Sequence, residues 1–220
     1  MTKEMNILLK NIPFLRHDQY NFIKFQIKNI LHAYATTKDE GVIYTVKLSS
    51  LDKIFSLFTN LNESQVALLS KVVDIEEHYQ ADSLLTELKS YVIPFRNTTE
   101  KTITKLFPKV KKLKAPDLKT IDFREISYIG WYDIRSERKF LVADYNGELI
   151  GIQGTFMKSI KGICSLCNSY EEVGLFTANV RSGKETYTNR GNYICADSDN
   201  CNQNLTSLEK LKKFIELLSN

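Results

Sequence analysis

Two short stretches near the C-terminus decide the fold of this chain: KGICSLCNSY at residues 161–170 and RGNYICADSDNC at residues 190–201. They contain all the cysteines of the protein, which are Cys164, Cys167, Cys195 and Cys201. Zinc favours four sulfur ligands in a tetrahedron, and two cysteines separated by two residues reach one ion from a tight turn. The pattern therefore predicts one structural Zn²⁺, because four thiolates leave no open position at the metal for catalysis.

The second cysteine pair is spaced more widely than the first, with the five residues ADSDN between its members. This segment has to leave the last strand and return before a helix begins. A strand, a loop and a helix would then supply the second pair of ligands, which is the general plan of a treble-clef zinc finger. We expect Asp197 and Asp199 to be caps or loop formers rather than general acids.

Two other roles for paired cysteines stay open at this point. A Cys-x-x-Cys pair can be a redox site, but thioredoxin-like pairs begin a helix in a βαβ unit, and β-rich runs surround this one. Two disulfides would require an oxidising compartment. The first 20 residues have no apolar run that suits a signal peptide, and no stretch of about 20 apolar residues suggests a membrane helix. We therefore expect a soluble, cytoplasmic protein.

The region around the cysteines has β character. From Ile121 onward the period of apolar residues shifts towards two, and Asn146-Gly147 between two β-rich runs predicts a hairpin. Residues 171–180 and 185–195 predict two further strands, joined by a turn at Ser182-Gly183.

A terminal helix is expected after the last cysteine. Thr206 is the predicted N-cap, with Glu209 at the capping-box position. The spacing predicts an apolar face with Phe214 and Leu217 at its margins. Its central members are Leu208, Leu211, Ile215 and Leu218.

The first half of the chain has helical periodicity instead. Apolar stripes at helical spacing occur in residues 18–34, 51–58, 62–77 and 81–95. Asn62 and Gln65 form a capping-box pattern, and Asp82 is the predicted cap of the following helix, which has to stop before Pro94. A fifth helix is expected to end or kink at Pro108.

These patterns predict an α+β protein of two domains. The chain has 220 residues, of which 43% are hydrophobic, so it can bury a sizeable core and could hold one or two domains. We expect residues 1–95 to form a helical bundle and residues 96–220 to form a mixed α/β domain with a four-cysteine, treble-clef-like zinc finger. The border is expected within the connector at about residues 94–116.

The positive charge of the chain is concentrated in that connector. The segment 101–119 has seven lysines and one acidic residue, Asp117, whereas the formal net charge of the whole chain is +4. Its lysines are Lys101, Lys105, Lys109, Lys111, Lys112, Lys114 and Lys119. Such a run can meet phosphate or an acidic protein face, and it can equally be a solvated helix face.

No pattern in the chain predicts an enzyme. The sequence lacks a Walker loop, a Gly-x-Gly-x-x-Gly motif and a Gly-x-Ser-x-Gly motif. Its three histidines, His17, His32 and His78, all lie in the helical half, far in sequence from the cysteines. We therefore predict no catalytic residue and no small-molecule substrate.

Several segments of the chain resemble the FusB-type fusidic acid resistance proteins. They are YVIPF (91–95), KLFPKVKKLKAP (105–116), GWYDIRSERKFLV (130–142), KGICSLCNSYEEVGLF (161–176) and RGNYICADSDNCNQNLTSLEKLKKFIELL (190–218). The resemblance implies a helical bundle followed by an α/β domain whose four cysteines are zinc ligands. It also implies binding to elongation factor G, the translocation GTPase, chiefly through the zinc-bearing domain.

The family resemblance also implies a mechanism and a set of residues that contact the partner. Fusidic acid locks elongation factor G on the ribosome after GTP hydrolysis, and the resistance protein frees the factor without modifying it or the drug. Arg190 and Tyr193 match basic and aromatic positions of the family, and Phe214 matches an aromatic residue on its last helix. Ile163 stands where the family often has phenylalanine, which removes aromatic area. We expect Ile163 and Phe214 to be exposed and Phe176 to be buried.

Two other functions remain open from the sequence. The first is a zinc-finger protein that binds ribosomal RNA or another nucleic acid through the lysine-rich segment 101–119. The second is a housekeeping partner of the translation factor in which rescue from the drug is incidental. The sequence does not separate this housekeeping role from drug resistance, because both would use the same factor-binding surface.

Overall fold

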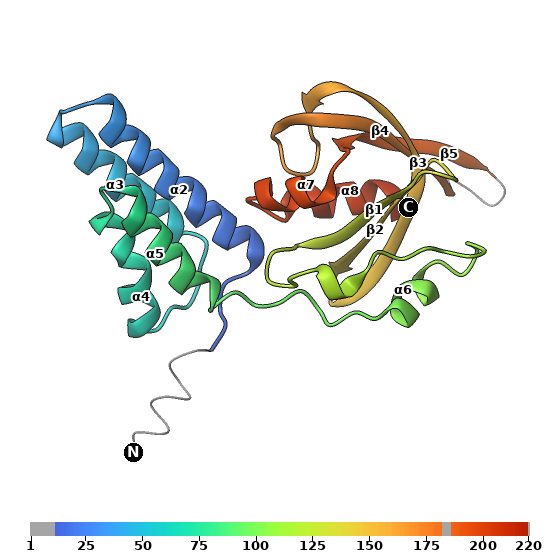
Figure 1. The fold of residues 1–220 in the computed structure, drawn as a ribbon, viewed down its shortest axis with the longest axis horizontal. Helices are drawn as coiled ribbons and strands as arrows, with labels where there is room; N and C mark the ends of the chain where they lie inside the picture. Colours follow the sequence, from blue (N-terminus) through green and yellow to red (C-terminus); the bar gives the residue numbers. More distant parts are fainter. Residues whose placement is uncertain (1–11, 182–185, 220) are drawn as a thin grey trace, which may run out of the picture. The chain divides into compact units, whose positions relative to one another are not determined.

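The computed structural model describes residues 12–181 and 186–219, and the chain divides into two compact units, Met1–Ile93 and Pro94–Asn220 (Figure 1). Each unit has a hydrophobic core of its own. The first is a bundle of helices and the second is built on an antiparallel sheet, so the predicted fold class is confirmed.

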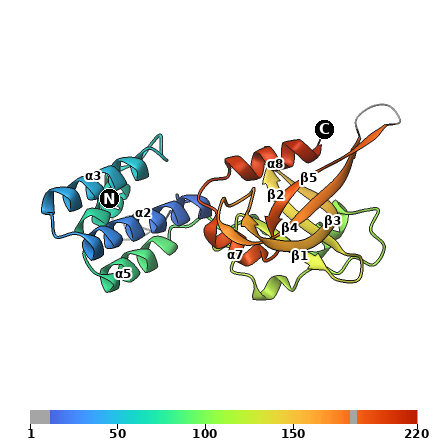
Figure 2. The ribbon, with the colours of Figure 1, turned by 90° about the horizontal axis from the view of Figure 1, so that it is seen from above.

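The first unit is a helical bundle whose long helices pack side by side (Figure 2). Its described helices are α2 (His17–Thr36), α3 (Glu40–Phe55), α4 (Glu63–Ser70), the 3-10 helix η1 (Lys71–Asp74) and α5 (His78–Lys89). Ile23, Ile27 and Ile30 recur on one face of α2 and are fully buried. They pack with Ile54 of α3 and Leu88 of α5, as the apolar stripes predict.

Side-chain caps set the starts of these helices. Asn62 and Gln65 form the predicted capping box at the start of α4. The prediction that Asp82 caps the next helix is wrong, because α5 begins four residues earlier. There the Gln80 amide oxygen accepts a hydrogen bond from the Glu77 backbone N–H at 2.9 Å, which completes a capping box.

The second unit contains a five-stranded sheet in which every strand pairs with its neighbour in the chain. Its strands are β1 (Tyr128–Asp133), β2 (Arg138–Tyr145), β3 (Glu148–Ile163), β4 (Tyr170–Arg181) and β5 (Tyr187–Cys195). The predicted hairpin at Asn146-Gly147 is confirmed, with both residues at positive φ (52° and 82°), as a type I′ turn requires. The predicted turn at Ser182-Gly183 lies outside the described residues.

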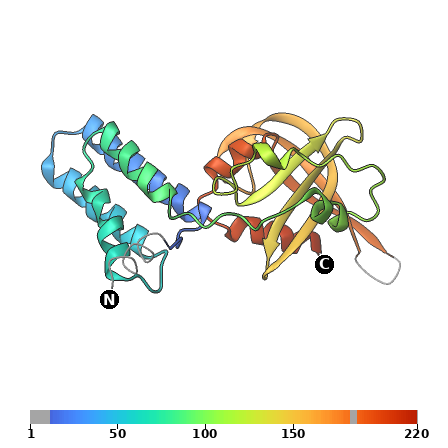
Figure 3. The ribbon, with the colours of Figure 1, turned by 60° about the horizontal axis from the view of Figure 1, so that its bottom comes forward.

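Helices lie on both faces of this sheet (Figure 3). They are α6 (Glu100–Leu106), the short η2 (Leu118–Thr120), α7 (Ser198–Asn204) and α8 (Glu209–Ser219). Along β2, Leu141 belongs to the core beneath α8, and its neighbours Phe140 and Val142 belong to the core beneath α6. This alternation is what a strand buried on both faces requires.

The two helix boundaries predicted in this unit have different outcomes: the fifth helix ends before Pro108 as expected, whereas the last helix begins later than predicted. The fifth helix, α6, ends at Leu106, before Pro108, and packs on the sheet rather than in the bundle. Thr206 does not cap the last helix, which begins at Glu209 with the Ser207 hydroxyl accepting a hydrogen bond from the Glu209 N–H. Within the described ranges, no helix is long and apolar enough to cross a bilayer.

Candidate metal centre and binding surface

The first cysteine pair lies in a tight turn between β3 and β4. The Cys164 carbonyl accepts a hydrogen bond from the Asn168 N–H at 2.9 Å, and the Cys164 N–H donates to the Ser169 carbonyl at 3.0 Å. Asn168 has a φ of 63°, a conformation that asparagine tolerates better than most residues do. The turn therefore holds Cys164 and Cys167 close to one point.

The second pair comes from the end of a strand and from a short helix. Cys195 is the last residue of β5, and Cys201 lies on α7. The Asp197 carboxylate caps α7 by accepting from the N–H groups of Asp199 and Asn200. The predicted loop between the cysteines is therefore only two residues long before α7 begins, and Asp197 has the expected capping role.

All four cysteines are buried, and their sulfur atoms lie within 4.8 Å of one another. The Cys164 and Cys201 sulfurs are 3.8 Å apart, and those of Cys167 and Cys195 are 3.6 Å apart. Four sulfurs about 2.3 Å from one zinc ion stand about 3.8 Å from each other in a regular tetrahedron. The donor set and its spacing therefore fit one structural Zn²⁺.

The environment of Cys164 favours the thiolate that binds metal. Hydrogen bonds from Cys167 and from the other two sulfurs hold the pKa of Cys164 well below its usual range. The backbone N–H groups of Leu166 and Cys195 also donate to this sulfur, each at 3.3 Å. N–H groups that point at a zinc-bound sulfur stabilise its negative charge.

A buried lysine stands beside the cysteine cluster. The Lys139 ammonium on β2 donates a hydrogen bond to the Ala196 carbonyl at 2.7 Å. Burial lowers the pKa of Lys139 to about 8, and the negative charges of Cys201 and Cys195 oppose this shift. Because four thiolates outweigh the double charge of zinc, the Lys139 ammonium offsets part of the excess negative charge.

The side chain of Asn202 ties α7 to β1. Its amide oxygen accepts from the Ser127 N–H at 2.7 Å, and its amide nitrogen donates to the Tyr128 carbonyl at 2.9 Å. Asn202 follows Cys201 directly, so these hydrogen bonds fix the helical turn that carries the fourth sulfur. Sequence reasoning missed Asn202 and Lys139, because their partners lie far away in the chain and leave no local signal.

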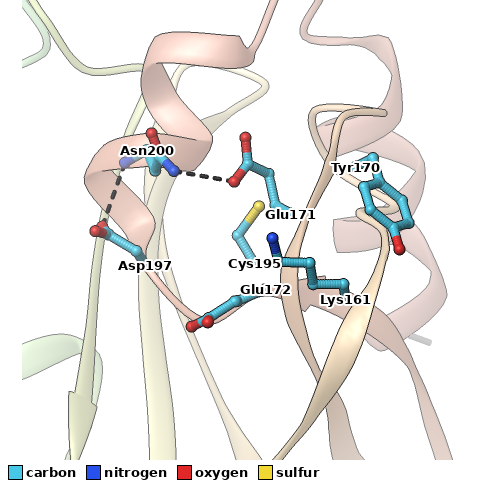
Figure 4. A pocket seen from close by; sticks show the side chains of 7 residues that line it. All are labelled: Lys161, Tyr170, Glu171, Glu172, Cys195, Asp197 and Asn200. Atoms are coloured by element: carbon cyan, nitrogen blue, oxygen red, sulfur yellow. Dashed lines mark hydrogen bonds between the residues drawn. The ribbon is translucent and has the colours of Figure 1, made fainter.

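A pocket of about 270 Å³ opens beside Cys195 (Figure 4). It is lined by Lys161, Tyr170, Glu171, Glu172, Cys195, Asp197 and Asn200. The Glu171 carboxylate accepts hydrogen bonds from the Asn200 and Asn204 amides, at 3.1 and 3.0 Å, and so links β4 to α7. Small-molecule sites are mostly apolar, so this polar lining favours a structural link over a ligand site.

The structure separates the four residues predicted for a partner surface. Ile163 and Tyr193 are 63% and 44% exposed, whereas Phe214 is only 4% exposed. The expected exposure of Phe214 is therefore wrong, and its ring packs 5.5 Å from that of Phe176, which is buried as predicted. The physical reason is helical spacing, because Phe214 follows Leu211 by three residues and belongs to the central stripe of α8.

Arg190 and Tyr193 lie on opposite faces of β5, since residues an odd number apart point to opposite sides of a strand. The Arg190 guanidinium donates to the Leu217 carbonyl near the end of α8, at 3.2 Å. It therefore stabilises the C-terminus of that helix. On the other face, Tyr193 stands opposite Leu175, which in turn stands opposite Met157.

We call this cross-strand row the apolar row; its members are Met157 on β3, Leu175 on β4 and Tyr193 on β5. Met157 and Tyr193 are exposed, and Ile160 adds another exposed apolar side chain next to the row. The Tyr193 carbonyl also accepts a hydrogen bond from the Ser165 N–H at 2.9 Å, inside the first cysteine turn. The metal centre therefore fixes one end of the row.

Two family models match the chain and together span most of it. The N-terminal domain of elongation factor G-binding proteins matches residues 14–96, and the FBP C-terminal treble-clef zinc-finger domain matches residues 104–216. The chain belongs to the family of elongation factor G-binding proteins. The second match also identifies the four-cysteine cluster as the treble-clef zinc finger of this family.

A solved structure is similar to this family member over nearly the whole of both chains. It is described as the fusidic acid resistance protein FusC and shares 32% sequence identity. The similarity covers 96% of this chain and 99% of that chain, with a TM-score of 0.81. A comparison with curated proteins found no match. The resemblance to FusB-type resistance proteins inferred from the cysteine segments is therefore confirmed.

Proposed function

We propose that this protein binds elongation factor G, promotes its release from the ribosome when fusidic acid has locked it there, and so protects translation. It acts as a binding partner and transforms neither the drug nor the factor. The observation that carries the proposal is the full-length similarity to a fusidic acid resistance protein, zinc unit included. The place of the factor in translation puts the protein in the cytoplasm.

The apolar row supplies a surface of the kind that binds a protein. Aromatic side chains on a rigid, partly apolar platform are typical hot spots of protein interfaces. A four-cysteine zinc site can contribute on the order of 10 kcal/mol to folding, so the strands that it joins stay fixed when a partner docks. We place the factor contact on Tyr193, Met157 and Ile160. Ile163 is exposed next to Cys164 but lies on the opposite strand face from Ile160, so we assign it to the zinc-side edge of the contact.

The other two residues suggested by the family support this surface from behind. Phe214 packs under the sheet against Phe176, and Arg190 holds the end of α8. Their replacement would change the shape of the platform rather than remove a contact atom from it.

Release of the factor requires differential binding. A partner shifts an equilibrium only by as much as it prefers one state over the other. The protein therefore has to bind the released conformation of the factor, or a strained one on the way to it, more tightly than the drug-locked one.

A reconstituted bacterial translation reaction tests this proposal. Fusidic acid at a concentration that stops synthesis is added, followed by the purified protein at increasing ratios to the factor. We expect synthesis to recover as the protein approaches stoichiometric amounts, and the Tyr193→Ala variant to require a higher concentration. If the parent protein restores no synthesis at any ratio, the proposal is wrong.

A further inference from the structure

The lysine-rich segment 101–119 remains unexplained by the contact with the factor. All seven of its lysines are exposed, and none forms an ion pair anywhere in residues 12–181 and 186–219. With seven lysines and one acidic residue, the segment has a formal charge of +6, more than the +4 of the whole chain. The net positive charge of the chain therefore comes from this segment, since the formal charge of the rest of the chain is −2.

This segment is held firmly although most of it has no regular structure. The Phe107 ring meets the rings of Phe140 and Trp131 edge-on, at 5.3 and 5.8 Å between centroids. The apolar side chains between the lysines pack on the same core; they are Leu106, Val110, Leu113, Ala115 and Leu118. Apolar residues thus face the sheet and lysines face solvent, so the charges stand on a fixed scaffold.

The composition of this surface fits a phosphate backbone better than a protein face. None of the large exposed hydrophobic side chains lies between Pro94 and Asp133, a stretch that is described throughout. Protein interfaces are built around aromatic and arginine anchors and are depleted in lysine. Lysine ammonium groups bind phosphate oxygens as point charges and do not read the base sequence.

The lysines and the apolar row lie on the same side of the sheet. Leu149 of β3 belongs to the core beneath α6, and Met157 follows it by eight residues on the same strand face. The α6 side of the sheet is covered over β1 and β2, and it carries the exposed apolar row over β3, β4 and β5. A factor on the row would leave the neighbouring lysines free to hold a second molecule.

We propose that the exposed lysines of residues 101–119 bind the phosphate backbone of RNA, without sequence preference, while the apolar row binds the protein partner. This contact between the lysines and RNA goes beyond the proposed function. It rests on the proposed function in one respect, because the ribosome would supply the RNA. It would hold the protein beside a ribosome-bound factor.

The test is a fluorescence anisotropy titration of a labelled RNA hairpin at several potassium chloride concentrations. The test variant is Lys105→Gln/Lys109→Gln/Lys111→Gln, and the matched control is Lys28→Gln/Lys38→Gln/Lys53→Gln, three exposed lysines of the first unit. Both lose three charges. Each phosphate contact contributes roughly 0.7 to the slope of log K against log salt, so we expect the test variant to lose about 2 from the slope and to bind about 10- to 100-fold more weakly near 0.1 M salt.

The control should bind RNA within about threefold of the parent, since its lysines lie outside the proposed surface. Equal binding by the two variants, or no RNA binding by the parent, would overturn the proposal. Binding to phosphatidylglycerol vesicles in place of RNA would also overturn it, because the partner would then be a membrane.

Gel filtration of the same variants with elongation factor G distinguishes a failure of the RNA-binding inference from a failure of the proposed factor binding. We expect the test variant to keep the factor and lose the RNA. Loss of the factor with RNA binding intact would mean that the lysines contact protein, which contradicts the inference. A parent that binds RNA but not the factor would contradict the proposed function alone.

Discussion

At the scale of single residues, each cysteine of the metal centre is required for zinc binding, because the ion is held only when all four sulfurs surround it. We expect Cys195→Ser to lose zinc, from about one ion per chain to near zero, since a hydroxyl is a poor ligand in a thiolate site. Elemental analysis of the purified protein measures this directly. Ser165→Ala is the control, because it alters the first cysteine turn without removing a sulfur. An unchanged metal content in Cys195→Ser would contradict the four-cysteine site.

Replacement of Phe214 by alanine should lower stability, whereas replacement of Tyr193 by alanine should weaken factor binding. Phe214 is buried against Phe176, so Phe214→Ala removes a core ring and should lower the free energy of unfolding by about 3–5 kcal/mol. Tyr193→Ala, at an exposed position, should change that free energy by less than about 1 kcal/mol and weaken factor binding by about tenfold or more.

Denaturant titration and a binding titration on the same two variants check this pair of expectations. Factor binding by Tyr193→Ala at the strength of the parent would show that the apolar row is not the contact surface. An unaltered unfolding free energy in Phe214→Ala would show that the ring is not part of the core.

At the scale of elements, β4 and β5 approach each other so closely at Gly191 that no side chain fits. A Cβ atom there would lie 1.8 Å from the Phe176 carbonyl oxygen. Gly191→Ala should therefore destabilise the second unit by several kcal/mol, about 3 or more, because backbone has to move. Gly147→Ala is the matched control: its Cβ meets nothing within 4 Å, and its cost should be about 1–2 kcal/mol from the positive φ alone. Equal losses of stability in Gly191→Ala and Gly147→Ala, measured by thermal unfolding, would contradict this pairing of β4 with β5.

The sequence correctly predicted the structural elements whose formation depends only on residues close together in the chain. The Asn146-Gly147 hairpin and the capping box of Asn62 and Gln65 need only their own neighbours, and both were predicted correctly. The four-cysteine cluster was predicted for the same reason, because the two cysteines of each pair lie close together in the sequence at a spacing that suits a metal ligand pair. The start of α5 is the exception: Asp82 belongs to the commonest type of capping residue but lies inside the helix, and Glu77 is the cap.

Long-range packing decides what the sequence could not show. The sequence predicts that a helix supplies part of the second cysteine pair, but it does not predict that this helix, α7, is separate from the terminal one. The seven residues of α7 carry no apolar stripe, and Asn202 ties the helix to β1. The burial of Phe214 depends on Phe176, and the role of Lys139 depends on Ala196. Each of these partners is distant in the chain, so residue type alone could not separate surface from core.

At the scale of the whole molecule, the only tryptophan of the chain reports on the zinc unit alone. Trp131 lies on β1 and stacks on Phe140 at 5.1 Å, whereas helices α2 to α5 belong to the first unit. Removal of zinc with a strong chelator should shift the Trp131 emission to longer wavelength, because the sheet loses its metal anchor. Far-UV circular dichroism at 222 nm should keep most of its helical signal. Loss of both signals together would mean that the two units unfold as one.

The central claim is that this chain is a partner of elongation factor G, and gel filtration of the two purified proteins tests it most directly. The mixture is run at moderate and at high salt, with each protein alone as reference. An apolar contact surface predicts one stoichiometric complex that elutes earlier than either protein under both conditions, because salt screens charges and leaves apolar burial intact. Separate elution of the two proteins at both salt concentrations would contradict the claim.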